Sequence, residues 1–144
     1  MTGIFRKISA LFEAPEAAAS DHDPAALGLA ALMVRLARAD GAFDGAERAA
    51  IQAALDARFG NGAALLAAGE VAEADASDSH QFTRLVKAAS APEDRAALLE
   101  DLWSVVLADG ARDDDENALM RQFGALLYVS DQDMARARHR AERR

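Results

Sequence analysis

The chain has 144 residues, contains no cysteine and carries a formal net charge of −8 at pH 7. Its length supports one domain with a core of ordinary size, and the missing cysteine excludes disulfides, thiolate metal sites and thiol catalysis. The acidic balance repels nucleic-acid phosphates, so no nucleic acid is expected as a partner, and it favours cations or basic protein partners.

The beginning of the chain predicts a short helix followed by a linker. The apolar residues within 4–12 share one helical face beside Arg6 and Lys7, which indicates an amphipathic helix over residues 1–12. We expect this helix to dock on the protein's own core, and the alternative is peripheral contact with a membrane surface through residues 4–12. Residues 13–23 are small and polar and include a proline, which is typical of a linker.

Residues 24–144 form the body of the protein and predict seven further helices. Alanine is the most abundant residue and β-branched runs are missing, so helix is favoured almost everywhere. The expected helices cover about 24–39, Asp44 to Gly60, 63–74, 79–90, the stretch from Ser90 to the second Asp-Gly, 113–127, and the stretch from Ser130 into the arginine-rich C-terminus. The expected fold is all-α, a compact array of seven to eight helices.

Local signals define several of these helix ends. Asp23 is suited to the N-cap position and Pro24 to the first helical position. Ser90 with Glu93 reads as a capping box, and Ser130 is expected to cap the last helix. The apolar positions at helical spacing predict a core made of Leu27, Ala30, Ala31, Val34, Ile51, Leu55, Phe59, Leu65, Leu66, Val71, Phe82, Leu85, Val86, Leu98, Leu99, Leu102, Val105, Val106, Met120, Phe123 and Leu127.

A nine-residue pattern occurs twice and is the strongest functional signal. Residues 39–47 read Ala-Asp-Gly-Ala-Phe-Asp-Gly-Ala-Glu, and residues 108–116, 69 positions later, read Ala-Asp-Gly-Ala-Arg-Asp-Asp-Asp-Glu. We call these two stretches the acidic motifs. Each follows an apolar helix and precedes a second one, so one helix hairpin is used twice and the fold should have two pseudo-symmetric halves.

The acidic motifs allow a structural and a metal-binding interpretation. Structurally, the glycine ends one helix and the Asp-x-x-Glu pair caps the next. Capping does not explain Asp40 and Asp109, which lie at helix C-termini, where the dipole disfavours a carboxylate. A bound cation would relieve the repulsion, and oxygen ligands favour Ca²⁺, Mg²⁺ or Mn²⁺. The candidate ligands are Asp40, Asp44, Glu47, Asp109, Asp113 and Glu116.

A calcium EF-hand is disfavoured, although its spacing fits in part. The aspartates, glycine and glutamate fall on positions 5, 6, 9 and 12 of that loop, but positions 1 and 3 hold Leu36 and Arg38 in the first motif, and Val105 and Leu107 in the second. None of these four residues supplies the required carboxylate oxygen. The motifs therefore leave open capping alone or capping combined with a weak site for a cation or a basic partner.

No catalytic constellation is visible in the sequence. It has no phosphate-binding glycine loop, no Gly-x-Ser-x-Gly elbow and no His-Glu-x-x-His, and His22, His80 and His139 lack ligand spacing. We therefore expect no enzyme activity, and the alternative is a metal-dependent hydrolase that uses the same carboxylates. Trp103 is expected in the core or at its boundary. The arginines of the last nine residues are expected to form a solvated helix end.

The two acidic motifs and their flanking helices resemble the TerB-like family, which is named for a tellurite-resistance protein. The resemblance rests on residues 29–59 and 98–129, each an apolar helix ending in Ala-Asp-Gly, followed by Asp-x-x-Glu and a second helix. The stretch Leu99-Glu100-Asp101-Leu102-Trp103 resembles the stand-alone bacterial members in particular. Phe43 and Gly45 depart from a fully acidic pattern.

The resemblance implies an all-helical fold whose paired acidic motifs hold a divalent metal. Carried over by position, the implied ligands are Asp40, Asp44 and Glu47 with Asp109, Asp113 and Glu116. It also implies a role in tellurite or other chemical stress, and related domains occur fused to membrane-anchored co-chaperones. We therefore expect a cytoplasmic interaction module near the membrane, since no stretch approaches the roughly 20 apolar residues of a membrane span and no signal peptide is visible.

Overall fold

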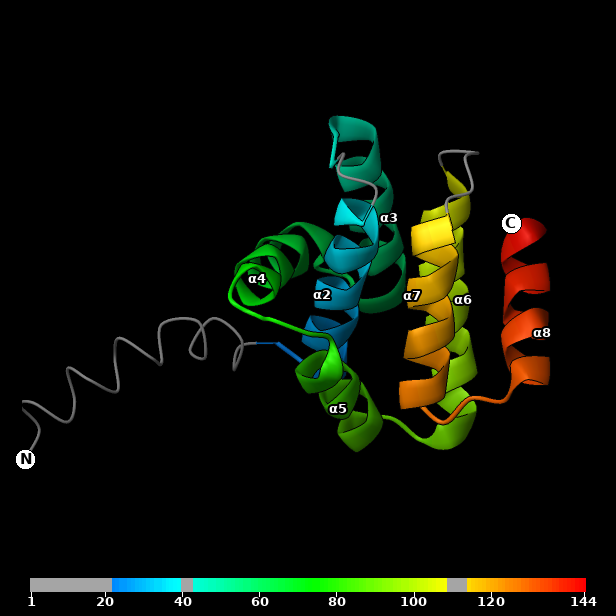
Figure 1. Cartoon of the computed structure of the whole chain (residues 1–144). Coiled ribbons are helices and arrows are strands. Elements are labelled where there is room, and N and C mark those ends of the chain that lie inside the picture. The colour runs from blue at the N-terminus through cyan, green and yellow to red at the C-terminus, as the bar shows by residue number, and fades with distance from the viewer. Residues whose placement is uncertain (1–21, 40–42, 109–113) are drawn as a thin grey trace, which may run out of the picture.

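The computed structural model describes residues 22–39, 43–108 and 114–144, which form helices joined by short loops (Figure 1). Seven helices lie within these ranges, and the all-α prediction is confirmed. They are α2 (Pro24–Arg38), α3 (Gly45–Phe59), α4 (Gly62–Ala74), α5 (His80–Ala89), α6 (Pro92–Ala108), α7 (Asp114–Leu126) and α8 (Asp131–Glu142). The predicted helix over 1–12, with its membrane-contact residues 4–12, and nearly all of the linker lie outside the described residues.

Helix α2 is the centre of the fold. Apart from Arg35 and Arg38 in its last turn it is apolar, which is typical of a helix buried nearly all round, and twelve of its fifteen residues are buried. It packs mainly against α4 and α5 and also contacts α3, α6 and α7. Figure 1 shows it between the α4–α5 side and the α6–α7 side of the molecule. None of the helices in the described ranges has both the length and the hydropathy needed to cross a bilayer.

Two glycines allow the neighbours of α2 to approach closely. A Cβ atom on Gly28 would lie 2.8 Å from the carbonyl oxygen of Phe82 on α5. A Cβ atom on Gly69 of α4 would lie 2.8 Å from the Cβ of Ala30. Both distances are shorter than van der Waals contact, so the α2–α5 and α2–α4 interfaces require a residue without a side chain at positions 28 and 69.

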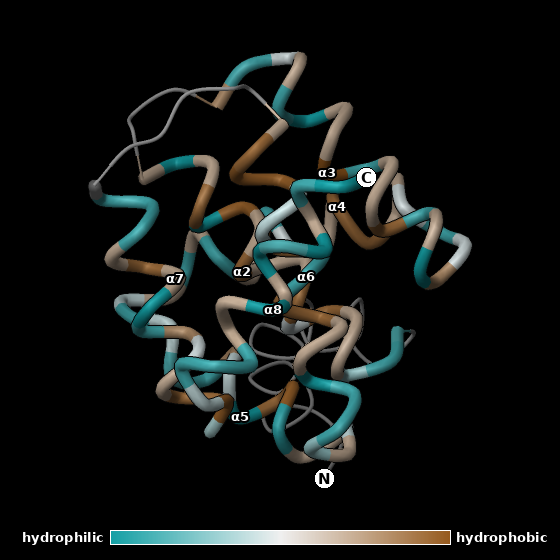
Figure 2. The backbone as a smooth tube through the Cα atoms, turned by 90° about the vertical axis from the view of Figure 1, so that its right-hand side faces the viewer, coloured by the Kyte–Doolittle hydropathy of each residue, from teal (hydrophilic) through white to brown (hydrophobic). Residues whose placement is uncertain are grey.

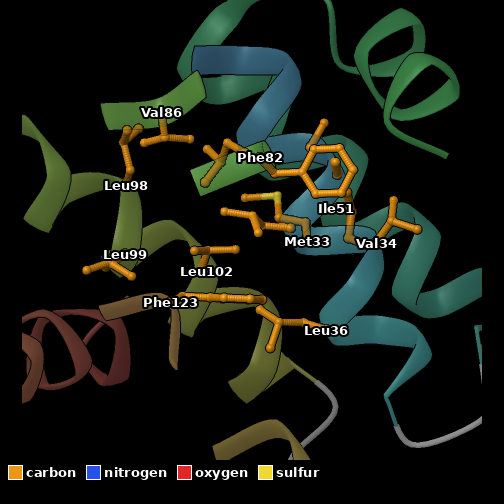
Figure 3. Packing of buried hydrophobic residues seen from close by; sticks show 14 of the residues in the cluster. Met33, Val34, Leu36, Ile51, Phe82, Val86, Leu98, Leu99, Leu102 and Phe123 are labelled. Carbon is orange, nitrogen blue, oxygen red and sulfur yellow. The ribbon is translucent and has the colours of Figure 1, made fainter. Parts of the chain in front are cut away.

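The two halves of the fold share one apolar core. Met33 and Leu36 of α2 face Leu102 of α6 and Phe123 of α7 in Figure 3, and Phe82 of α5 joins them from the other side. All five side chains are at most 2% exposed. Burial of such side chains contributes about 1.5–3 kcal/mol each before chain entropy is counted, so this core joins the first helix hairpin to the second.

Helix α8 covers α6 and faces the solvent on its other side. It contacts α6 and buries Ala137 and Ala141, and its remaining surface is mostly polar. Figure 2 looks onto this face, where the α8 tube is largely hydrophilic. Helix α8 is therefore an outer, polar helix on the surface of an inner layer formed around α2 and α6.

Most of the predicted helix ends are confirmed by their caps. The Asp23 carboxylate accepts from the Ala25 amide at 2.8 Å, and Ser130 Oγ accepts from the Asp133 amide at 3.1 Å. Gly60 ends α3 in the left-handed conformation with φ of 88°. The predicted glycine stops at Gly41 and Gly110 lie outside the described residues.

Two predictions about helix faces and helix ends are wrong. Val71 is 51% exposed, because α4 turns the opposite face inward, with Leu65, Gly69 and Glu73. Ser90 does not form the predicted capping box for α6, since its hydroxyl donates to the Val86 carbonyl at the end of α5. A serine between two helices can serve either one, and here the extended backbone of Ser90 ends the first helix.

Candidate functional site

The structure describes three of the six predicted metal ligands. Asp44, Glu47 and Glu116 lie within the described ranges, whereas Asp40, Asp109 and Asp113 lie outside them. Across residues 22–39, 43–108 and 114–144, no three histidine, aspartate or glutamate side chains come close enough to hold a metal ion. The complete six-carboxylate site stays a prediction.

Asp44 has the capping role that its spacing predicts. Its backbone is extended, with φ of −93° and ψ of −178°, and its Oδ1 accepts from the Glu47 amide at 2.9 Å. Such a cap stabilises a helix by about 1 kcal/mol. The side chain is exposed, so its negative charge faces the solvent.

The glutamates of the two motifs occupy matching positions in the first turns of α3 and α7. Glu47 is half-buried and Glu116 is buried, with 5% of its surface exposed. The positive end of the helix dipole favours a carboxylate at this position. The reduced exposure of both glutamates indicates that they stabilise the first turns of their helices. Asp44 and Asp115, in contrast, are exposed.

The helix ends that flank the two acidic motifs lie at the same end of the molecule. Figure 1 shows the end of α2 and the beginning of α3 on the same upper side as the end of α6 and the beginning of α7. The helices are also neighbours, because α6 contacts both α2 and α3, and α2 contacts α7. The described helix ends on either side of both acidic motifs therefore lie at one end of the fold, which the sequence separation of the motifs alone does not require.

Two arginines lie beside the first acidic motif. The guanidinium carbons of Arg38 and Arg48 lie 5.5 Å and 5.3 Å from the centre of the Phe43 ring. Arg48 also pairs with Glu70 of α4 at 2.7 Å, and the hydrogen bond that its guanidinium donates to this carboxylate raises the pKa of Arg48 above its ordinary value. Phe43, which interrupts the acidic pattern, therefore lies against two cationic side chains.

An ion-pair cluster around the buried Glu73 supports α2 from the side of α4. The Glu73 carboxylate accepts from Arg35 Nε at 3.2 Å and also from Arg38. Arg35 donates further to the Ala76 carbonyl at 2.8 Å and stacks on Phe82 at 6.0 Å. This cluster was not predicted from the sequence, although arginines at i and i+3 on an otherwise apolar helix are a signal for a buried acidic partner.

The sequence predicted a solvated helix end for the C-terminal arginines, but two of them form ion pairs with α6. Arg140 pairs with Glu100 at 3.0 Å, and Arg144 pairs with Asp101 at 2.9 Å. Asp101 is buried and also binds Arg58, and its hydrogen bond raises the pKa of Arg58. The acidic surface that the tail contacts is therefore on α6 of the same chain.

The histidine and tryptophan predictions can be compared directly. His80 and His139 have exposed side chains, and His22 is half-buried. Trp103 is buried at 6% exposure, and the guanidinium of Arg138 lies 5.3 Å from its ring centre. Packing at the boundary between α6 and α8 is thus confirmed for Trp103.

These features define an all-helical domain built on two related helix hairpins, each carrying an acidic motif at its junction. Residues 26–139 match the family described as Tellurite resistance protein TerB. Since the match covers most of the chain, the protein belongs to the TerB family. No curated protein and no solved structure matches the chain significantly.

Proposed function

We propose that this TerB-family chain is a non-catalytic binding module of a cytoplasmic chemical-stress response, and that its two acidic motifs together hold a divalent cation. The observation that carries the proposal is that the helix ends flanking the two acidic motifs lie at one end of the fold (Figure 1). The family description as a tellurite resistance protein supports the link to chemical stress.

Electrostatics supports a cation at this end. The two motifs bring eight carboxylates into two short segments, and like charges placed close together repel each other unless a counter-ion lies between them. The chain as a whole is also acidic, so its long-range field attracts cations. All candidate ligands are carboxylates, which favour the hard ions Ca²⁺, Mg²⁺ and Mn²⁺.

Capping and cation binding are compatible at Asp44. A carboxylate has two oxygens and about four acceptor positions, and the cap uses Oδ1 for one hydrogen bond to the Glu47 amide. The buried Glu116 fits a supporting role for the helix start better than a solvent-facing ligand. We therefore expect the aspartates of the motifs to contribute more to cation affinity than the glutamates do.

Calorimetric titration with Ca²⁺, Mg²⁺ and Mn²⁺ tests the proposal. The wild type is compared with the double variant Asp40→Asn/Asp109→Asn, and each melting curve is measured in parallel at matched ionic strength. For a dissociation constant of about 1 mM, about 10 mM ion stabilises the folded state by about 1.4 kcal/mol. The double variant should lose both the heat and the melting shift.

A charge-matched control separates a site from general attraction. Asp75→Asn/Glu93→Gln removes the same two charges from exposed positions at the end of α4 and the start of α6. The control variant should bind like the wild type. Absence of heat and of a melting shift in the wild type contradicts the cation site, and equal loss in both double variants indicates only nonspecific screening. Metal-dependent cleavage of bis(p-nitrophenyl) phosphate that Asp40→Asn abolishes would favour the hydrolase alternative.

A further inference from the structure

Helix α4 presents an apolar face to the solvent. Its exposed residues lie within about 100° of the helix circumference, and we call them the α4 outer face: Ala63, Ala64, Ala67, Val71 and Ala74. None of the five is polar. Val71 is 51% exposed and is one of two large hydrophobic residues that are exposed in the described part of the chain.

The charged residues of α4 face the protein rather than the solvent. The helix has two of them, Glu70 and Glu73. Glu70 pairs with Arg48 of α3 at 2.7 Å, and Glu73 is buried against the arginines of α2. A surface helix normally turns its charged residues toward the solvent. The α4 outer face therefore has the composition of a contact surface.

The chain before α2 begins beside this face. Helix α4 packs on α2 and α3, and Figure 1 shows it at the edge of the molecule, on the side away from α7 and α8. The first described residue, His22, has its Nδ1 atom 3.3 Å from Nδ2 of Asn61, the N-cap residue of α4. Residues 1–21 are therefore attached next to the N-terminal end of the α4 outer face.

The attached segment contains apolar residues at helical spacing and is long enough to reach the whole face. The large apolar side chains within residues 4–12 are Ile4, Phe5, Ile8, Leu11 and Phe12. Residues 13–21 separate them from His22 and span up to about 30 Å when extended, whereas α4 is about 20 Å long. Such a tether keeps the segment at an effective concentration of about 1 mM, which favours it over a free partner.

Charge complementarity gives the direction of the segment. A segment that enters from the N-terminal end of α4 has its own first residues at the C-terminal end of that helix. The exposed Asp75 and Asp78 follow this C-terminal end, and Arg6 and Lys7 lie near the start of the segment. Opposite charges therefore meet when the two helices run antiparallel.

We propose that residues 4–12 pack as a helix on the α4 outer face, antiparallel to α4. The large apolar side chains of the segment lie on the shallow alanine surface around Val71, and Arg6 and Lys7 face the two aspartates. The α4 outer face is thus a docking site for a segment of the same chain. It shares no residue with the acidic motifs, so this proposal and the proposed cation site stand or fall separately.

Trypsin cleavage of the full chain after Arg6 and Lys7 tests the docking, because a docked segment is cleaved only while it is released. The variant Ala67→Asp places a carboxylate in the middle of the α4 outer face, where burial against apolar side chains is costly. Its control is Ala135→Asp, the same change at an exposed position of α8 on the far side of the molecule (Figure 1). Mass spectrometry of the early fragments should show at least about fivefold faster cleavage in Ala67→Asp and an unchanged rate in the control.

The absence of cysteine from the chain allows the contact to be tested by a single introduced pair. A disulfide requires Cα atoms within about 7 Å. Ile8→Cys/Ala67→Cys should therefore form an intramolecular disulfide at least about fivefold faster than Ile8→Cys/Ala135→Cys, as measured by intact mass and non-reducing electrophoresis.

Three results would overturn the proposal. The first is equal behaviour of the α4 and α8 variants in both assays. The second is a disulfide that forms between two chains instead of within one, which indicates that a second copy covers the face. The third is protection of Arg6 and Lys7 that appears only with phosphatidylglycerol vesicles, which assigns residues 4–12 to a membrane surface.

Discussion

The close approach of α2 to its neighbours predicts opposite effects for the same substitution at different glycines. Gly28→Ala and Gly69→Ala place a methyl group in the α2–α5 and α2–α4 interfaces. Gly45→Ala adds the same methyl group at the start of α3, where no atom lies within 4 Å of the new Cβ. Helix propensity favours alanine at all three positions, so packing alone decides the difference.

The magnitudes follow from the distances. In an open helical position the change from glycine to alanine stabilises by about 0.4–1 kcal/mol. At Gly28 the new Cβ would lie 2.8 Å from the Phe82 carbonyl oxygen and 3.0 Å from Val86 Cγ2. A backbone carbonyl does not rotate away as a side chain does, so α5 must shift, and overpacking costs about 1–3 kcal/mol. We expect Gly28→Ala to lose about 1–2 kcal/mol net.

Gly69→Ala should behave like Gly28→Ala. Its new Cβ would lie 2.8 Å from the Cβ and 2.9 Å from the carbonyl carbon of Ala30, and Ala30 is on the central helix. Gly45→Ala should instead stabilise by up to about 1 kcal/mol. The three variants therefore differ in sign although the chemical change is identical.

Urea unfolding followed by far-UV circular dichroism measures these effects, with thermal melting as a second readout. At this chain length a change of 1 kcal/mol moves the melting temperature by about 4 °C. If Gly28→Ala is as stable as the wild type or more stable, the close packing of α2 on α5 is refuted. If all three variants change stability equally, helix propensity rather than packing governs these positions.

Three further predictions concern charged side chains. Asp101→Asn leaves the guanidinium group of Arg58 without its carboxylate and removes one of the two carboxylates that Arg144 contacts, since Arg144 also pairs with Glu100. Both arginines are partly exposed, so urea unfolding should show a loss of about 1–3 kcal/mol. Asp44→Ala removes the cap of α3 and should cost about 1 kcal/mol in the same assay. The hydrogen bond that the His80 backbone amide donates to Asp78 lowers the pKa of this carboxyl group. The contribution of the ionised Asp78 to stability is therefore present above the ordinary carboxyl pKa and is lost as the pH falls through the lowered pKa of the folded state. A carboxyl ¹³C titration should show a lower pKa for Asp78 in the folded chain than in the urea-unfolded chain.

Some features of the fold could be predicted from local sequence, because helix caps act over three or four residues. Asp23 with Pro24, Gly60, and Ser130 define helix ends through contacts with their immediate neighbours. The repeated motif likewise indicated two helix hairpins before any packing was known. The family followed from the same repeat, and its match covers residues 26–139.

The inward face of α4 could not be predicted in this way. Hydrophobicity alone favours Val71 for the core, but the face that packs on α2 contains Gly69 and Glu73. Gly69 fits there because it leaves room for Ala30, and Glu73 fits because Arg35 and Arg38 neutralise it. Both reasons involve residues more than 30 positions away.

The sequence by itself determined the helical class, the positions of most helices and the pair of acidic motifs, since these depend on local spacing and composition. Tertiary structure decided which helices became neighbours. It brought the ends of α2 and α6 to the same end of the molecule (Figure 1), docked the C-terminal arginines on Glu100 and Asp101, and enclosed Trp103 between α6 and α8. Such pairings result from the burial of complementary surfaces across long sequence separations, and no local pattern encodes them.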